Sequence, residues 1–388
     1  MASGCVSTGS PTFCKDIMPV RSLPLTTGIQ VLTHTTARGF FNAAWLALSK
    51  RESAANIIFP CALQILSLEG TIQAVLGDAE TQLSTSQLDI QVQSNSPRLS
   101  PNVSGEGSSN SYLWFTCWSG YEERRPCLDI ILSCTVGASG PQPIFLWSGL
   151  PPSQTTQEHL DPRIAMLAKK LFAIVPVTRV FSVFGPVALT KTFSRHWSNI
   201  TGMTQIMKPL YAAKLLYATR ETLTKSSTLP SGDTIRPGSP DDISAIGGLC
   251  KAFSETSIYY PLSPEEAMRE ATELVFNHQV WVYETEGGQI ATITAVARVS
   301  PNVATITKVY TCITRRKGGY AERLVREVVR EMLYSLEKQR VVLYVGNGNA
   351  AANVYSRVGF RGLQEEDGTE EVEEWLEIGF RGTCRGHW

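Results

Sequence analysis

The chain has 388 residues, a length that allows a large buried core and is typical of two domains. Its 35 basic and 35 acidic residues give a formal net charge of zero, so no bulk attraction to nucleic acid or to a membrane surface is implied. Nine cysteines and five histidines occur without a CxxC pair or two histidines at ligand spacing, and no apolar run reaches membrane-spanning length. We therefore expect a small molecule as partner, no metal, and a reduced, cytoplasmic setting. Composition leaves the oligomeric state open.

Residues 1–230 predict a first domain with a mixed order of strands and helices, ending in a crossover and linker at 203–232. Polar residues rich in Gly, Ser and Pro predict a surface loop at 91–110. Strands are predicted at 30–34, 112–118, 128–134, 143–148 and 179–184, and helices at 43–48, 163–175 and 186–200. Within the crossover, KLLYATR is interpreted as either a strand between the domains or part of a helix.

Residues 231–388 predict the second domain. A strand and a helix are expected within 233–253, and a helix with its acids first at 264–277. A hairpin is predicted from strands at 279–285 and 290–299, and a closing strand at 370–380.

The stretch from 304 to 336 has the pattern of a strand, a basic glycine turn and an amphipathic helix. The turn holds Arg315, Arg316, Lys317, Gly318 and Gly319. The first amides of a helix lack intrahelical acceptors and lie at the positive end of its dipole, so a phosphate placed there is hydrogen-bonded and charge-stabilised. The glycines let the backbone approach such a ligand closely. The alternative interpretation is an ordinary turn with solvated basic residues.

A second strand at 340–345 leads through a glycine loop into a short helix. Gly346, Gly348 and Ala351 give the pattern G-x-G-x-x-A, the fingerprint of a dinucleotide-binding turn. That fold requires several further strand–helix units, and too few residues follow Ala351 to form them. The dinucleotide hypothesis is therefore disfavoured.

Arg316, Gly319 and Ala321 form the pattern R-x-x-G-x-A, which resembles the acyl-CoA pyrophosphate motif of the GNAT superfamily of N-acyltransferases. The residues VYT before it, and Asn349 with AAANVYSRVGF after the next strand, are similar to neighbouring elements of that superfamily. The resemblance covers residues 234–380 and implies an α/β fold with a mixed (α+β) sheet. It also implies acetyl-CoA or another acyl-CoA as co-substrate, bound by Tyr310, Thr311, Arg316, Lys317, Gly318, Gly319, Tyr320, Ala321 and Asn349.

Acyl transfer from a thioester to an amine needs a donor for the oxyanion and an acid for the departing thiolate. By the resemblance, backbone amides within 310–312 face the carbonyl, and Tyr355 protonates the thiolate. A phenol with a pKa of about 10 can share a proton with a thiolate of about 8.5 at little cost. The alternative role of Tyr355 is packing against the sheet.

The general base is less well defined. Related enzymes often carry a glutamate on the strand before the motif, but that strand presents Thr305, Thr307 and Lys308 here. Glu284 is the candidate base, with Glu286 as a second possibility, although carboxylates at the end of a hairpin strand also suit a turn. Cys312 is a competing candidate as a covalent nucleophile, because a helix N-terminus and basic neighbours lower a thiol pKa.

A faint internal repeat predicts that the first domain is a second, degenerate copy of the same fold. Residues 179–197 can be laid on 341–360, so that Phe193 falls on Tyr355. In place of the basic glycine turn, residues 149–162 contain prolines that remove amides and acids that repel phosphate. We therefore expect two GNAT-like domains and an acyl-CoA-dependent N-acyltransferase acting on a small-molecule amine. The alternatives are O-acylation, a base-catalysed rearrangement of a metabolite, or a non-catalytic CoA-binding protein.

Overall fold

The computed structural model describes residues 28–69, 112–120, 126–137, 140–226, 228–257, 261–365, 372–383 and 386. The surface loop predicted at 91–110 lies outside these residues. In the described part of the chain, no helix has the length and apolar character needed to cross a bilayer.

The first half follows the order strand, two helices, three strands, helix, strand, helix and strand. Its elements are β1 (Gln30–His34), α1 (Ala37–Lys50), α2 (Ile58–Leu68), β2 (Leu113–Ser119), β3 (Cys127–Cys134), β6 (Ile144–Ser148), α5 (Gln157–Phe172), β7 (Ser182–Pro186), α6 (Val187–Thr201) and β8 (Tyr211–Ala218). A small hairpin of β4 (Val136–Gly137) and β5 (Gly140–Pro141) follows β3. The strand alternative for KLLYATR is confirmed, because these residues lie largely in β8.

The second half repeats the same order. Its elements are β9 (Thr234–Pro237), α7 (Ile243–Ser254), α8 (Pro264–Phe276), β10 (Val280–Glu284), β11 (Ile290–Val299), β12 (Val303–Thr311), α9 (Tyr320–Arg330), β13 (Arg340–Gly346), α10 (Ala351–Val358) and β14 (Glu373–Gly379). A π-helical segment, Glu331–Ser335, extends α9. The predicted correspondence of the two halves is therefore confirmed element by element.

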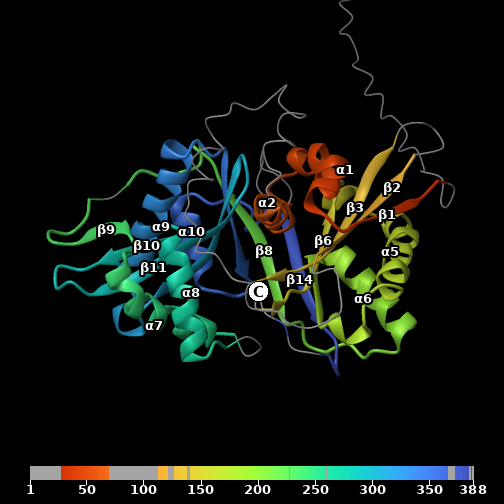
Figure 1. Cartoon of the computed structure of the whole chain (residues 1–388). Helices are drawn as coiled ribbons and strands as arrows, with labels where there is room; N and C mark the ends of the chain where they lie inside the picture. The colour runs from red at the N-terminus through yellow and green to blue at the C-terminus, as the bar shows by residue number, and fades with distance from the viewer. Residues whose placement is uncertain are drawn as a thin grey trace, which may run out of the picture.

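All the main strands join one mixed sheet of 12 strands, in the order β1-β2-β3-β6-β7-β14-β8-β13-β12-β11-β10-β9 (Figure 1). The last strand of each half is exchanged. β8, which closes the first half in sequence, pairs antiparallel with β13 of the second half, while β14 pairs antiparallel with β7 of the first. β8 and β14 also pair with each other at the centre. The two halves thus share a continuous sheet through strands that each supplies to the other.

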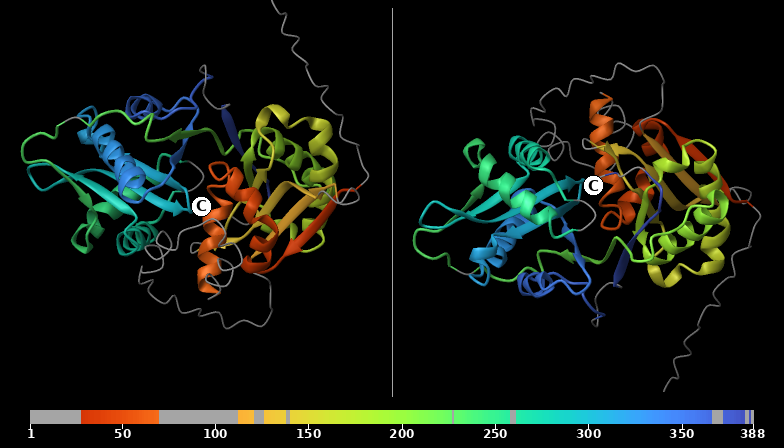
Figure 2. Two further views of the ribbon diagram at one scale, coloured as in Figure 1. Left: turned by 90° about the horizontal axis from the view of Figure 1, so that it is seen from above. Right: turned by 90° about the horizontal axis from the view of Figure 1, so that it is seen from below.

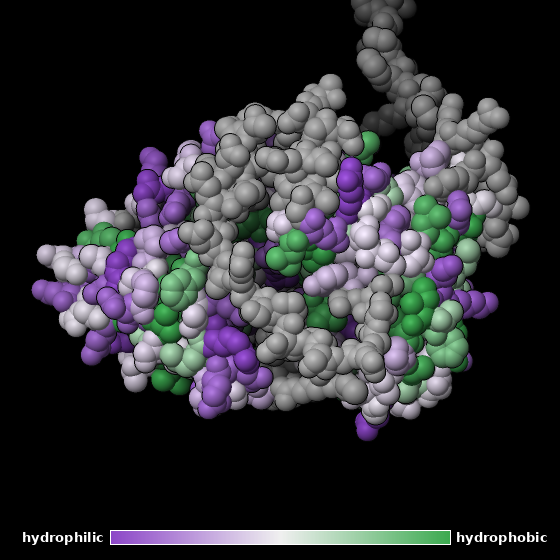
Figure 3. All heavy atoms as spheres, in the orientation of Figure 1, coloured by the Kyte–Doolittle hydropathy of each residue, from purple (hydrophilic) through white to green (hydrophobic). Residues whose placement is uncertain are grey.

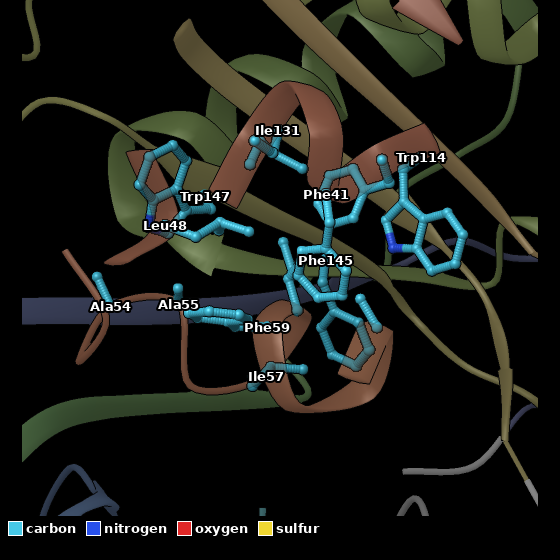
Figure 4. Packing of buried hydrophobic residues seen from close by; sticks show 14 of the residues in the cluster. Phe41, Leu48, Ala54, Ala55, Ile57, Phe59, Trp114, Ile131, Phe145 and Trp147 are labelled. Atoms are coloured by element: carbon cyan, nitrogen blue, oxygen red, sulfur yellow. The ribbon is translucent and has the colours of Figure 1, made fainter. Parts of the chain in front are cut away.

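Helices cover both faces of the sheet in each half. In the second half α9 lies on one face and α7 and α8 on the other (Figure 2). In the first half α5 and α6 pack on one face, and α1 and α2 bring the aromatic core of Figure 4 to the other. That aromatic core includes Val303 and Val342 from the second half, so α1 and α2 bury side chains of both halves. On the face shown in Figure 3, hydrophilic and hydrophobic residues are mixed over both halves.

The prediction that a helix begins at residue 163 was wrong, because α5 begins at Gln157. Thr156 starts the helix by accepting a hydrogen bond from the amide of His159 with its side chain. Pro162 lies inside the helix without ending it. The segment predicted as a long turn at 149–162 is therefore short, and its last residues are helical.

Candidate functional site

The centre of the candidate site is a fork between two parallel strands. β12 and β13 pair from Val303 opposite Arg340 to Ile306 opposite Leu343, and their pairing ends there. β12 nevertheless continues along β11 to Thr311, and β13 continues along β8 to Gly346. The two strands therefore diverge beyond Ile306 and Leu343, and we call this divergence the strand fork.

A β-bulge in β12 explains the divergence. On β11, Ala295 lies opposite Lys308 and Val296 lies opposite Ile306, so Thr307 is an extra residue. A bulge increases the local twist and bends the strand that carries it. The bulge lies next to the last position at which β12 pairs with β13, so it turns the end of β12 away from β13.

Backbone amides at the end of β12 were expected to face an acyl carbonyl. The amide of Cys312 donates to the carbonyl of Ala291 on β11, at 2.9 Å, so it is not available. Because amides alternate in direction along a strand, the amide of Tyr310 also points to β11 and that of Thr311 points into the strand fork. Thr311 is thus the amide of the three that fits an oxyanion donor.

The turn before α9 has the backbone of an anion site. Lys317 and Gly319 adopt positive φ angles of 70° and 76°, and Gly319 is the N-cap residue of α9. No side chain caps the amides of the first turn of α9. A Cβ on Gly318 would lie 2.5 Å from the ring of Tyr320, so only glycine fits there. Tyr320 is held by Tyr283, with the ring centroids 4.9 Å apart.

The basic side chains of this turn remain on the surface beside α9. The guanidinium of Arg316 lies 5.4 Å from the centroid of the Tyr310 ring, and Arg315 hydrogen-bonds Gln289. Arg323 donates to the carbonyl of Gly318 at 2.8 Å and so braces the turn. Within the described residues, Arg315, Arg316 and Lys317 form no ion pair with a carboxylate, so their charge is available to an anion. A diphosphate fits this combination of uncapped amides, glycine backbone and cations.

Asn349 has a local role at the start of α10. Its side-chain oxygen accepts a hydrogen bond from the amide of Ala351 at 2.9 Å. The nearby turn of Gly346, Gly348 and Ala351 does not continue a parallel sheet, because β13 is parallel to β12 alone and antiparallel to β8. The topology excludes the dinucleotide hypothesis.

Tyr355 lies on α10, buried against the sheet. Its ring packs on Phe360 with centroids 5.8 Å apart, and among the described residues its hydroxyl has no hydrogen-bond partner. Burial, together with nearby Tyr211, raises the pKa of Tyr355 well above its ordinary value. The phenol therefore stays protonated through the neutral range, and the same raised pKa makes it a weaker acid toward a thiolate than an exposed tyrosine.

Glu284 is placed away from Tyr355. Its carboxylate accepts a hydrogen bond from Arg236 at 2.8 Å, and Arg236 also binds Asp242 at 2.6 Å. The Arg236 side chain lowers the pKa of Asp242 to about 2. β10, which carries Glu284, is separated from β12 by β11, which corresponds to about 10 Å at the usual strand spacing. The structure therefore does not bring Glu284 and Tyr355 together.

The remaining sequence candidates near the base position are also engaged. Lys308 is buried and forms an ion pair with Glu270 of α8 at 2.6 Å. The thiol of Cys312 lies 3.3 Å from the hydroxyl of Thr314. Hydrogen bonding from Thr314, with a contribution from Arg315 and Arg316, lowers the pKa of Cys312.

One residue near the site was missed by sequence reasoning. Tyr211 of β8 lies against the end of β13, where a Cβ on Gly346 would be 3.3 Å from its ring. It is contributed by the first half through the exchanged strand. No local sequence signal predicts this proximity, because the pairing of β8 with β13 joins segments more than a hundred residues apart.

The equivalent turn of the first half differs from that of the second. Thr156 caps α5, and Glu158 lies in its first turn, so the amides there are partly used and face a negative charge. At the position of Tyr355, Phe193 is fully buried and stacks on Trp197, with centroids 5.8 Å apart. This turn is unsuited to a phosphate, and Phe193 has no proton to donate.

The described surface has two hollows outside the strand fork, between α9 and the connection after β8. They have volumes of about 260 and 640 Å³, and both are lined by Ser226, Glu327 and Arg330. The smaller hollow is lined by Arg323, Arg326 and Arg330 with Glu327 as its one acidic residue, whereas the lining of the larger includes Lys225 and Arg330 beside Glu327 and Glu331. These hollows lie along the outer side of α9, away from the strand fork.

Residues 276–362 match a protein family described as an acetyltransferase (GNAT) domain. This match contains β12, the basic glycine turn, β13 and α10, so the family resemblance of this stretch is confirmed. Comparison of the sequence with curated proteins finds no match.

Several solved structures similar to this chain are described as GNAT proteins. A GCN5-related N-acetyltransferase from Kribbella flavida has 14% identity and a TM-score of 0.43, covering 65% of this chain and 87% of its own. A GCN5-related N-acetyltransferase from Sphaerobacter thermophilus has 13% identity and a TM-score of 0.45, and the match covers 69% of this chain and 80% of that protein. A tandem GNAT protein from the clavulanic acid biosynthesis pathway has 10% identity and a TM-score of 0.44, covering 92% and 99%.

Proposed function

We propose that the protein is an acyl-CoA-dependent N-acyltransferase that acts on a small-molecule amine, with acetyl-CoA as the expected donor. The observation that carries this proposal is the turn before α9, where uncapped helix amides, Gly318 and Gly319, and Arg316 lie together at the end of β12. With the CoA diphosphate bound at this turn, the pantetheine arm would lie in the strand fork. The thioester would then approach the Thr311 amide.

In the proposed reaction, the amine nitrogen attacks the carbonyl carbon of the thioester. A C–N bond forms, the C–S bond breaks, and CoA leaves as a thiolate. The Thr311 amide stabilises the oxyanion, and Tyr355 donates a proton to the thiolate, or shares it. The attacking amine loses one proton to water, because Glu284 is bound to Arg236 and lies away from the fork.

The lack of a strand carboxylate supports a second candidate. β12 presents Thr305, Thr307 and Lys308, and Lys308 is bound to Glu270. Without a dedicated base, a protein with this turn could bind CoA without transferring the acyl group, or transfer it to a hydroxyl. Thiol release from acetyl-CoA with a panel of amines and alcohols separates these candidates from N-acylation.

The binding step is tested by calorimetry of acetyl-CoA with two variants. Arg316→Glu reverses the charge that faces the diphosphate, and Gly319→Val puts a side chain into a left-handed position beside Arg323. We expect each variant to weaken binding by at least about tenfold, because one charge-assisted hydrogen bond contributes about 1.5–3 kcal/mol.

The chain offers a matched control for each variant. Gly202 ends α6 with a φ of 74°, close to that of Gly319, and has open space around it, so Gly202→Val imposes the same strain far from the turn. Arg381→Glu reverses the charge of an exposed arginine after β14. If the turn variants, still folded, bind acetyl-CoA as tightly as these controls, CoA does not bind at the turn.

A further inference from the structure

A buried polar cluster lies where helices of the first half cover the sheet of the second. The connection from α1 to α2 reaches this sheet, since Glu52 accepts hydrogen bonds from the hydroxyl of Ser300 and the amide of Asn302, the latter at 2.7 Å. The aromatic core of α1 and α2 also buries Val303 and Val342. The first half therefore forms one wall beside the closed end of the strand fork.

Five side chains bring polar groups to this wall, and we call them the midline cluster. They are Asn56, Tyr211, Arg298, Thr305 and Tyr344. The first two come from the first half and the other three from β11, β12 and β13.

The members of the midline cluster face the same side of the sheet. Ala304 and Ile306 pack in the core under α9, so Thr305 between them points to the opposite face. Tyr344 packs in the aromatic core of α1 and α2 on that opposite face. Asn56 donates to the hydroxyl of Tyr344 at 2.9 Å, which joins the two halves directly.

Arg298 supplies the positive charge of the cluster. It lies opposite Thr305, next to the position where the pairing of β12 and β13 ends. Burial lowers the pKa of Arg298, and the electrostatic effects of Tyr344 and Tyr211 on its guanidinium act in the opposite direction. A partly buried guanidinium beside phenol side chains suits a planar anion that can accept two hydrogen bonds.

Two atoms of the cluster have unused hydrogen-bonding capacity. The side-chain oxygen of Asn56 and the hydroxyl of Thr305 are buried, and neither has a partner among the described residues. The orientation of the Asn56 amide follows from its nitrogen, which donates to the carbonyl of Ser53 at 2.6 Å. Buried polar groups are nearly always paired in folded proteins, so these two atoms indicate a polar occupant.

We propose that the midline cluster binds the carboxylate of the acceptor, so that the acceptor is an amino acid. This inference rests on the proposed N-acyltransferase function and names its substrate class. Arg298 and the hydroxyls of Tyr344 and Thr305 bind the carboxylate. The acceptor oxygen of Asn56 receives a hydrogen from the amine. The closed end of the strand fork lies beside Arg298, so an amine a few bonds from the carboxylate reaches the thioester. The first half thereby contributes to substrate recognition without catalysing the reaction.

The test compares each standard amino acid with its carboxamide, which keeps the amine and removes the negative charge. In the full chain with acetyl-CoA, we expect the KM for the amino acid to be lower than that for the carboxamide by about 10- to 100-fold. Arg298→Met should raise the KM for the amino acid much more than that for the carboxamide, and so remove the preference between them. If the carboxamides are used equally well, or if Arg298→Met keeps the preference, the inference is overturned.

Two further variants keep the test valid if Arg298→Met fails to fold. Thr305→Val keeps the size of the side chain and Tyr344→Phe keeps the ring, and each removes one hydroxyl of the cluster. Both should raise the KM for amino acids more than they change kcat, with acetyl-CoA affinity unchanged. Equal effects on amino acids and carboxamides would show a structural role and overturn the inference.

Calorimetry of the amino acids in the presence of CoA separates this inference from the proposed function. Binding of an amino acid, lost in Arg298→Met, supports the carboxylate site even if no acyl transfer is found. Acyl transfer to amino acids and carboxamides alike would support the proposed function and overturn the site. The inference would also be overturned if the protein preferred CoA thioesters whose acyl group carries a carboxylate and showed no preference for a carboxylate on the amine.

Discussion

Removing the first half should unfold the second, because the exchanged strand β8 completes its sheet. A fragment of residues 231–388 lacks the six β8 residues that pair with β13 from Val341 to Gly346, and it leaves β14 without β7 and β8. Leu215 and Leu216 of β8 are buried in the full chain. At about 1.5–3 kcal/mol for each buried leucine, their loss alone costs about 3–6 kcal/mol. A whole domain is stable by only about 5–15 kcal/mol, so the fragment should not fold cooperatively.

A nicked form of the full chain provides the matched comparison. A protease site placed in the exposed residues 228–232 cuts the connection between the halves and leaves every strand in the sample. We expect the nicked protein to stay associated, to unfold cooperatively on heating and to bind acetyl-CoA. The isolated fragment should neither unfold cooperatively nor bind acetyl-CoA. Cooperative unfolding and full CoA affinity of the isolated fragment would refute the role given to the exchanged strands.

Three substitutions test single side chains. Tyr355→Phe should lower kcat by about 10²–10⁴-fold with little change in acetyl-CoA affinity, and an unchanged kcat would leave Tyr355 as a packing residue. Burial lowers the pKa of Lys338 from 10.5 to about 8, so the unfolded chain binds more protons between these values and stability rises with pH there. Lys338→Met should flatten that rise in urea titrations across this range; a persistent slope would contradict the assignment. Glu284→Gln should leave the pH–rate profile unchanged and lower stability by up to about 1 kcal/mol through the half-exposed pair with Arg236. Loss of the acidic limb of the profile, where the rate rises as a general base loses its proton, would instead make Glu284 the base.

Local patterns carried much of the prediction in the second half. The basic glycine turn and the helix after it were predicted because strand composition, helical periodicity and glycine chemistry all act within a few residues. The same holds for the repeat, since the strand and helix around Phe193 and those around Tyr355 have similar local patterns. The start of α5 was predicted wrongly because a single side chain, Thr156, caps the helix ahead of a proline.

Pairing across the sheet was beyond such reasoning. KLLYATR is a short apolar run that suits a strand or a helix, and its place between β13 and β14 depends on residues far away in the sequence. Glu284 was chosen as a candidate base because it is a carboxylate at the end of a strand. Its ion pair with Arg236 depends on the pairing of β9 with β10, which the sequence does not display.

The most direct test of the central claim is turnover of acetyl-CoA by the full chain with amine acceptors. Release of the CoA thiol is followed spectroscopically, and the acylated product is identified by mass spectrometry, with Gly319→Val and Gly202→Val run in parallel. The account predicts thiol release that depends on the amine, an N-acetylated product, loss of both in Gly319→Val and their retention in Gly202→Val. Bound acetyl-CoA that is not consumed with any amine would contradict it.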